Sequence, residues 1–66
     1  MTEQDYIQML RAEYKKMLLS KETTAMELNM SVTTLDRLRK KGELKSKKVS
    51  GQIMFSIAEV AKYLVA

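Results

Sequence analysis

The stretch Ser20–Gly42, SKETTAMELNMSVTTLDRLRKKG, contains two short helical patterns joined by the tight link Asn29-Met30-Ser31. Ser20 and Ser31 each stand where a helix N-cap is expected. Gly42 stands where a residue in the left-handed region usually ends a helix. Two helices with a link of this length make the helix-turn-helix arrangement. We expect residues 20–42 to form this motif and the rest of the chain to support it.

The second helix of the motif separates apolar from polar side chains. At about 100° per residue, Leu35 and Leu38 share one side with Val32 at its edge, and Arg39 lies nearby with its head reaching water. The opposite side collects hydroxyl and basic groups, namely Thr33, Arg37 and Lys40, flanked by Asp36 and Lys41. Such a helix suits the DNA major groove, because Arg bridges guanine O6 and N7 while Lys binds phosphate. The alternative is an ordinary helical hairpin whose polar side is solvated.

Composition limits the chemistry of the chain. Its 66 residues provide for a single domain, 1–66, with a small core. There is no Cys and no His, so disulfides, a thiolate nucleophile and the commonest general base are excluded. The scattered acids show no catalytic pair, and the two glycines form no phosphate-binding loop. We expect no enzymatic activity, no catalytic residue, no metal site and no cofactor.

The positive charge is concentrated in one segment. The net charge is +4, yet the cations and acids of residues 1–19 sum to zero. From Arg37 to Lys48 there are seven basic residues against Glu43 alone. A field of this kind attracts a polyanion and makes binding salt-sensitive, which favours a nucleic-acid partner. The alternative is a solvated lysine-rich loop.

The remaining segments are expected to pack on the motif. Residues 2–18 predict an amphipathic helix with a capping box at Thr2 and Asp5, and its apolar stripe either packs on the domain or joins two copies through Tyr6 and Met9. Alternation over residues 45–55 predicts a two-stranded hairpin around Ser50-Gly51, with Ile53 and Phe55 inward. Its lysines either touch DNA or protect an exposed strand edge. Residues 56–66 predict a closing helix with the capping box Ser56 and Glu59.

The order of these elements resembles the small winged helix-turn-helix DNA-binding proteins of the excisionase and MerR-like superfamily. The resemblance rests on LLSKETTAMELNMS, VTTLDRLRKKGEL and IMFSIAEVAKYL, within about residues 18–64. It implies a mainly α fold with a two-stranded β-hairpin wing, here preceded by an extra N-terminal helix. It also implies a groove-reading set and a wing set, which are Ser31, Thr33, Thr34, Arg37, Lys40 and Lys41, then Lys45, Lys47, Lys48 and Gln52.

This sequence departs from the family pattern at four positions. Lys21 and Thr23 replace an apolar residue and an acid, Asp36 replaces an aromatic residue and Arg39 replaces an apolar one. Asp36 is expected to orient Arg39 or Lys40, or to accept from a cytosine amino group. Against phosphate it would be repulsive.

The resemblance implies sequence-specific binding of double-stranded DNA in the cytoplasm of a bacterium or phage host, at the nucleoid. The leading role is an excisionase-like directionality factor that helps an integrase, since the short chain leaves no room for an effector domain. The alternative is a small transcriptional regulator acting on RNA polymerase. Self-association through the N-terminal helix or on DNA is compatible with either role, and no membrane partner is expected because no apolar run approaches the ~20 residues of a span. A protein-interaction module without DNA binding is the second alternative.

Overall fold

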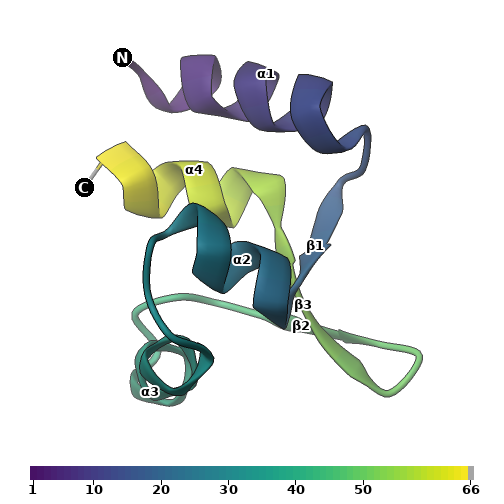
Figure 1. Cartoon of the computed structure of the whole chain (residues 1–66), viewed down its shortest axis with the longest axis vertical. Coiled ribbons are helices and arrows are strands. Elements are labelled where there is room, and N and C mark those ends of the chain that lie inside the picture. The colour runs from purple at the N-terminus through teal and green to yellow at the C-terminus, as the bar shows by residue number, and fades with distance from the viewer. Residues whose placement is uncertain (66) are drawn as a thin grey trace.

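The computed structural model describes residues 1–65, and within this range four helices surround a three-stranded antiparallel sheet (Figure 1). The strand order is β1-β3-β2, so β3 is the central strand. In chain order the elements are α1 (Glu3–Tyr14), β1 (Leu18–Ser20), α2 (Lys21–Glu27), α3 (Val32–Lys41), β2 (Lys47–Val49), β3 (Gln52–Ser56) and α4 (Ile57–Val65).

The third strand corrects the prediction of a two-stranded hairpin. Leu18 and Leu19 belong to strand β1. This strand pairs antiparallel with β3, with Leu19 opposite Phe55. The backbone N–H of Ile57 donates to the Met17 carbonyl at 2.9 Å and prolongs the pairing by one bond. A hairpin alone would leave one edge of β3 unpaired, and β1 satisfies that edge.

Helix α1 is shorter than the predicted range 2–18. Its start is as expected, because the Thr2 hydroxyl accepts from the Asp5 N–H and the Asp5 carboxylate accepts from the Thr2 N–H. The helix ends at Tyr14, since Lys15 adopts the left-handed conformation with φ of 56°. Met17, predicted on the inward stripe, is therefore off the helix and 61% exposed.

The motif helices begin and end as their sequence predicts. Ser20 and Ser31 cap α2 and α3, because their hydroxyl groups accept from the backbone N–H groups of Thr23 and Thr34, the third residue of each helix. Helix α3 ends at Gly42 with φ of 81°, where the Glu43 N–H donates to the Leu38 carbonyl at 3.0 Å. The same pattern closes α2 around Asn29, which has φ of 55°. Both helix ends are Schellman motifs, and the motif around Asn29 makes the sharp turn from α2 into α3.

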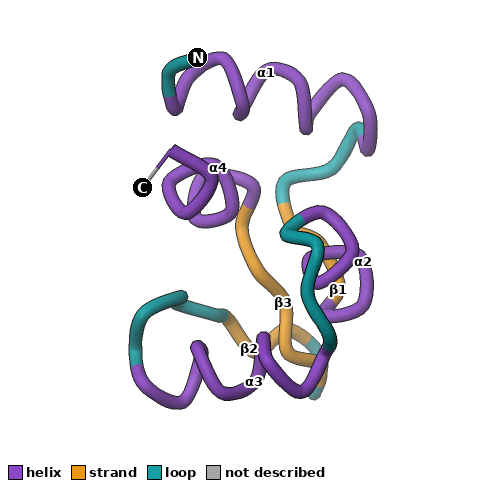
Figure 2. Tube along the Cα trace, turned by 60° about the vertical axis from the view of Figure 1, so that its left-hand side comes forward, coloured by secondary structure: helices purple, strands orange, loops and turns teal. Residues whose placement is uncertain are grey.

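The core lies between the sheet and the helices. Leu35 of α3, Phe55 of β3 and Val60 of α4 are each 0% exposed. They belong to a cluster of nine buried apolar side chains that includes Leu10, Leu19, Ala25, Leu44, Ile57 and Ala61. Helix α1 packs on α4, and α2 packs on α3 (Figure 2). The N-terminal helix is thus part of the domain, as its apolar stripe predicts, with Tyr6 half-buried and Met9 exposed.

The hairpin and the last helix lie within one or two residues of their predicted ranges, except that Ala66 lies outside the described residues, and one contact differs. Ser50 and Gly51 both have positive φ, which makes a type I′ turn. The Ser56 hydroxyl accepts from the Glu59 N–H at 3.1 Å. The Glu59 carboxylate accepts from the Lys45 N–H at 3.2 Å, so it does not complete the expected capping box. Glu59 instead connects α4 to the segment that precedes β2.

None of the helices in residues 1–65 has the length and apolar composition needed to cross a membrane.

Thr24 of α2 carries a buried hydroxyl group whose energetic cost can be tested. Its side chain is fully buried, and its hydroxyl oxygen has no hydrogen-bond partner among the described residues. An unpaired buried hydroxyl is unfavourable, so Thr24→Val should raise the free energy of unfolding by about 1 kcal/mol. Urea denaturation measures this change. Thr24→Ala is the control, because it also removes a methyl group and should gain less; a less stable Thr24→Val protein would contradict the assignment.

Candidate nucleic-acid interface

The outer face of α3 carries the predicted groove-reading residues. Thr33, Arg37, Lys40 and Lys41 are exposed, and so is Ser31 at the N-cap. Thr34 is half-buried, and its hydroxyl oxygen accepts from the Ser31 hydroxyl at 3.0 Å. The Ser31 hydroxyl also accepts from the Thr34 N–H at 3.1 Å. Ser31 and Thr34 are therefore engaged in capping α3, whereas the other four side chains point to solvent from one helix.

The predicted wing residues are exposed along the hairpin and its approach. Lys47 and Lys48 lie in β2 opposite Met54 and Ile53, and Gln52 pairs with Val49 next to the turn. Lys45 precedes β2 and is positioned by the bond from its N–H to Glu59. Because successive side chains of a strand point to opposite faces, Lys47 and Lys48 project to different sides of the hairpin. Strand β2 is also an edge of the sheet, so its lysines oppose pairing with another chain as well.

The cations of this surface have no acidic partner. Within residues 1–65 the ion pairs involve Asp36 alone, which binds Lys21 and Arg39. The remaining basic side chains from α3 to β2 are exposed and unpaired, and they are Arg37, Lys40, Lys41, Lys45, Lys47 and Lys48. Six cations that form no ion pair make a surface that attracts phosphate, with Glu43 as the one acid in the segment from Arg37 to Lys48. We call these six residues the α3–hairpin cluster.

Asp36 is turned away from this cluster and toward α2. One of its carboxylate oxygens lies 3.1 Å from Lys21 Nζ and 3.2 Å from Arg39 Nη2. Arg39 Nε also donates to Asp36 at 3.2 Å. Of its two predicted partners, Asp36 thus forms an ion pair with Arg39 and not with Lys40. The guanidinium expected to reach water is held against Asp36 instead, with its side chain 25% exposed.

Lys21 is the member of this site that sequence reasoning did not assign. It begins α2, fifteen residues before Asp36, and local spacing gives no sign of the contact. The one available signal was that Lys21, like Asp36 and Arg39, differs from the residue that is usual at its position in the resembled family. In the structure these three residues form one polar network between α2 and α3, and two cations neutralise the negative charge within it.

The network lowers the pKa of Asp36 below its usual value of 3.8. The main cause is the hydrogen bond from Lys21, and the hydrogen bond and positive charge of Arg39 act in the same direction. The pKa of Asp5 is also lowered, chiefly by its bond from the Thr2 backbone. Asp36 therefore stays ionised at neutral pH and keeps both cations in place.

No protein-family model, curated protein sequence or solved structure matches this chain.

Asp36 and its partners predict a defined acid sensitivity. Because the folded-state pKa is depressed, the network stabilises the protein above the unfolded-state pKa of about 3.9 and loses this effect as pH falls through the lower folded value. The stability gap between wild type and Asp36→Asn should therefore be largest near neutral pH and close in acid. Thermal unfolding at a series of pH values measures the gap.

Asp5→Asn serves as the matched control for the pH series. It removes the acid of the α1 capping box and leaves the α2–α3 contact intact. The stability difference between wild type and Asp5→Asn should also close in acid. The losses of stability from Asp5→Asn and Asp36→Asn should add in the double variant, because the two sites share no partner. A pH-independent gap for Asp36→Asn would show that the network is not ionic.

Proposed function

We propose that the protein binds double-stranded DNA with sequence preference, as a small winged helix-turn-helix protein. Helix α3 would lie in the major groove and the β2–β3 hairpin would lie over the adjacent backbone or minor groove. The observation that carries this proposal is the α3–hairpin cluster, six exposed cations without an acidic partner next to a helix that also presents Thr33. Direct readout needs a side chain that can bridge a base edge, and Arg37 is the member suited to guanine.

The packing of α2 on α3 supports the same geometry. The Schellman turn at Asn29 joins the two helices, Ala25 of α2 is buried, and Leu35 anchors α3 to the core. The outer side of α3 is thereby left free along its length. A recognition helix needs this combination, because it must be fixed on one side and accessible on the other.

The ion pairs of Asp36 reduce the repulsion that this carboxylate would exert on DNA phosphates. An unpaired carboxylate on α3 would repel phosphate. Here the carboxylate faces α2 and is neutralised by Lys21 and Arg39, so α3 can approach the DNA backbone. The cost to binding that Asp36 would otherwise impose is correspondingly reduced.

Within this proposal we favour the role of an excisionase-like accessory factor, which would bind repeated sites beside a recombination junction. A transcriptional regulator would use the same surface at an operator. Selection of bound duplexes from a random pool at two salt concentrations tests the proposal. A motif that survives the higher salt supports specific readout, and tandem copies of the motif favour the recombination role. Binding that disappears with salt and leaves no motif would contradict it and favour a protein-interaction module.

Substitutions at Arg37 and Lys48 should separate base reading from phosphate binding. Arg37→Ala should weaken binding to the selected duplex by about 1–3 kcal/mol and relax base preference. Lys48→Ala should weaken binding to all duplexes alike and reduce the salt slope by about 1. Fluorescence titrations with selected and random duplexes measure both effects. Equal losses on the two duplexes for both variants would show that Arg37 is not the reading residue.

A further inference from the structure

We propose that the C-terminal end of α1 is a second binding site for the DNA backbone, so that one molecule joins two duplex segments. This inference rests on the proposed function, because it assigns a second duplex to a protein whose α3 holds the first.

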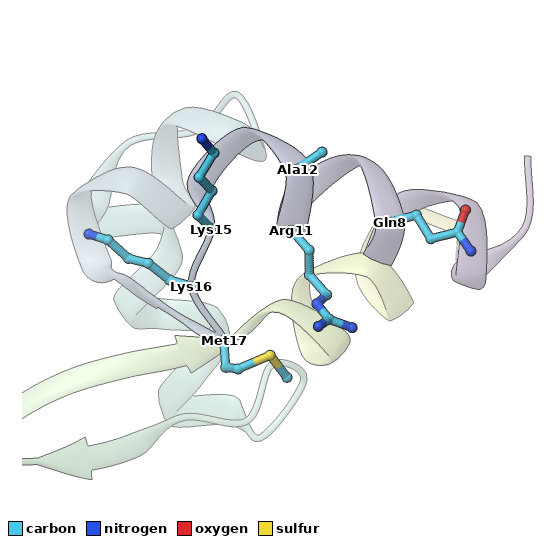
Figure 3. A pocket seen from close by; sticks show the side chains of 6 residues that line it. All are labelled: Gln8, Arg11, Ala12, Lys15, Lys16 and Met17. Carbon is cyan, nitrogen blue, oxygen red and sulfur yellow. The ribbon is translucent and has the colours of Figure 1, made fainter.

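Three cations gather at this end of the molecule. An open pocket of about 490 Å³ is lined by Gln8, Arg11, Ala12, Lys15, Lys16 and Met17 (Figure 3). Its described lining contains Arg11, Lys15 and Lys16 but no acid, and none of these three takes part in an ion pair within residues 1–65. The site therefore carries three positive charges that no neighbouring carboxylate neutralises. We call these three residues the α1 cluster.

The acids of α1 lie elsewhere on the helix. Glu3 and Asp5 are in the first turn, at the opposite end, and Asp5 is engaged in the N-cap. Glu13 lines a separate pocket with Tyr6 and Glu27. The charges of residues 1–19 sum to zero, but Glu13, although in the last turn of α1, faces another pocket, so Arg11, Lys15 and Lys16 share a surface that includes no acid.

The arrangement of the α1 cluster fits an extended polyanion better than a single small anion. In Figure 3 the charged ends of Arg11, Lys15 and Lys16 point in different directions from the end of the helix and do not meet at one point. Arg11 and Lys15 are four residues apart, about 6 Å along a helix axis. Phosphates of one DNA strand recur about every 3.4 Å of duplex axis. Several consecutive phosphates could thus contact the cluster together.

The position of Lys15 adds a second observation. Its φ of 56° lies in the left-handed region, where glycine is the commonest residue at a helix end. The chain instead places a lysine there, between two other cations. Because of this turn, the Lys15 side chain leaves the end of α1 in a different direction from Arg11, and the positive surface is wider as a result (Figure 3).

The two cation clusters cannot serve the same straight duplex. Both views place α1 and α3 at opposite ends of the molecule, whose longest Cα extent is 27 Å (Figures 1 and 2). The major groove that would receive α3 is only about 8.5 Å deep. The α1 cluster therefore stays clear of the duplex bound at α3 and is available to a second segment.

A two-duplex capture experiment tests the inference. A biotinylated duplex carrying the selected site is saturated with protein on beads, washed, and offered a fluorescent duplex of unrelated sequence. Wild type should retain the fluorescent duplex, and a fourfold rise in salt should weaken this retention about 40-fold, as three phosphate contacts imply. Arg11→Gln/Lys15→Asn/Lys16→Gln should lose at least nine-tenths of the retained signal and bind the first duplex as wild type does.

The controls separate the possible causes of failure. Lys15→Asn keeps a residue that tolerates positive φ, and Lys62→Gln removes an exposed cation outside both clusters and should change nothing. Wild type that binds the first duplex but never retains the second would overturn the inference and leave the proposed function standing. Wild type that binds no duplex would overturn both.

Bridging by paired copies is distinguished by mixing two variants. One variant carries Arg37→Ala/Lys40→Ala and lacks the α3 contact, and the other lacks the α1 cluster. If a single molecule holds both duplexes, the mixture should not restore retention. Restoration by the mixture would overturn the inference, since the second duplex would then be held by a second copy.

Discussion

Strand β3 is bonded along both of its edges, and the positions of the helices depend on this double pairing. On one side β2 brings the hairpin lysines, and on the other side β1 sets Leu19 opposite Phe55. Ser20 is both the last residue of β1 and the N-cap of α2, so the strand pairing fixes the start of the motif helices. Helix α4 follows β3 directly, and α1 precedes β1 by three residues. A change in the register of β1 would move α2 and α3 relative to the hairpin.

The contact between α2 and α3 combines an apolar and a polar part. Leu35 of α3 and Ala25 of α2 are buried in the common core, while Lys21, Asp36 and Arg39 meet at the partly exposed margin of the two helices. Exposed ion pairs contribute little to stability, so the apolar part sustains the fold. The polar part matters for the surface of α3, because it removes one negative charge from the face that the cations occupy. Three of the four departures from the pattern of the resembled family, Lys21, Asp36 and Arg39, thus compensate one another.

Local features of the fold were predictable from the sequence, and long-range ones were not. Ser20, Ser31 and Gly42 mark helix ends because capping depends on residues within one turn, and Ser50-Gly51 marks its turn for the same reason. Strand β1 is only three residues long and its residues pair with partners 34 to 38 positions away, so periodicity could not reveal it. Helix periodicity continued past Tyr14, and the left-handed Lys15 that ends α1 has no sequence signature. Nine of the ten predicted site residues lie on α3, at its N-cap or on the hairpin strands, whereas Lys45 precedes β2. Ser31 and Thr34 are engaged with each other, and Lys21 was missed because its partner is distant in the chain.

The charge of a segment and the charge of a surface are different quantities, and the N-terminal helix shows why. Summed over residues 1–19 the helix is neutral, which predicts no role in binding a polyanion. The fold ends α1 early, turns Lys15 and Lys16 outward and leaves the acids on other faces. Glu3 and Asp5 lie in the first turn of α1, and Glu13, two residues from Arg11 and thus about 200° around the helix, lines a different pocket with Tyr6 and Glu27. The molecule therefore presents two positive surfaces, and the α3–hairpin cluster accounts for only one of them.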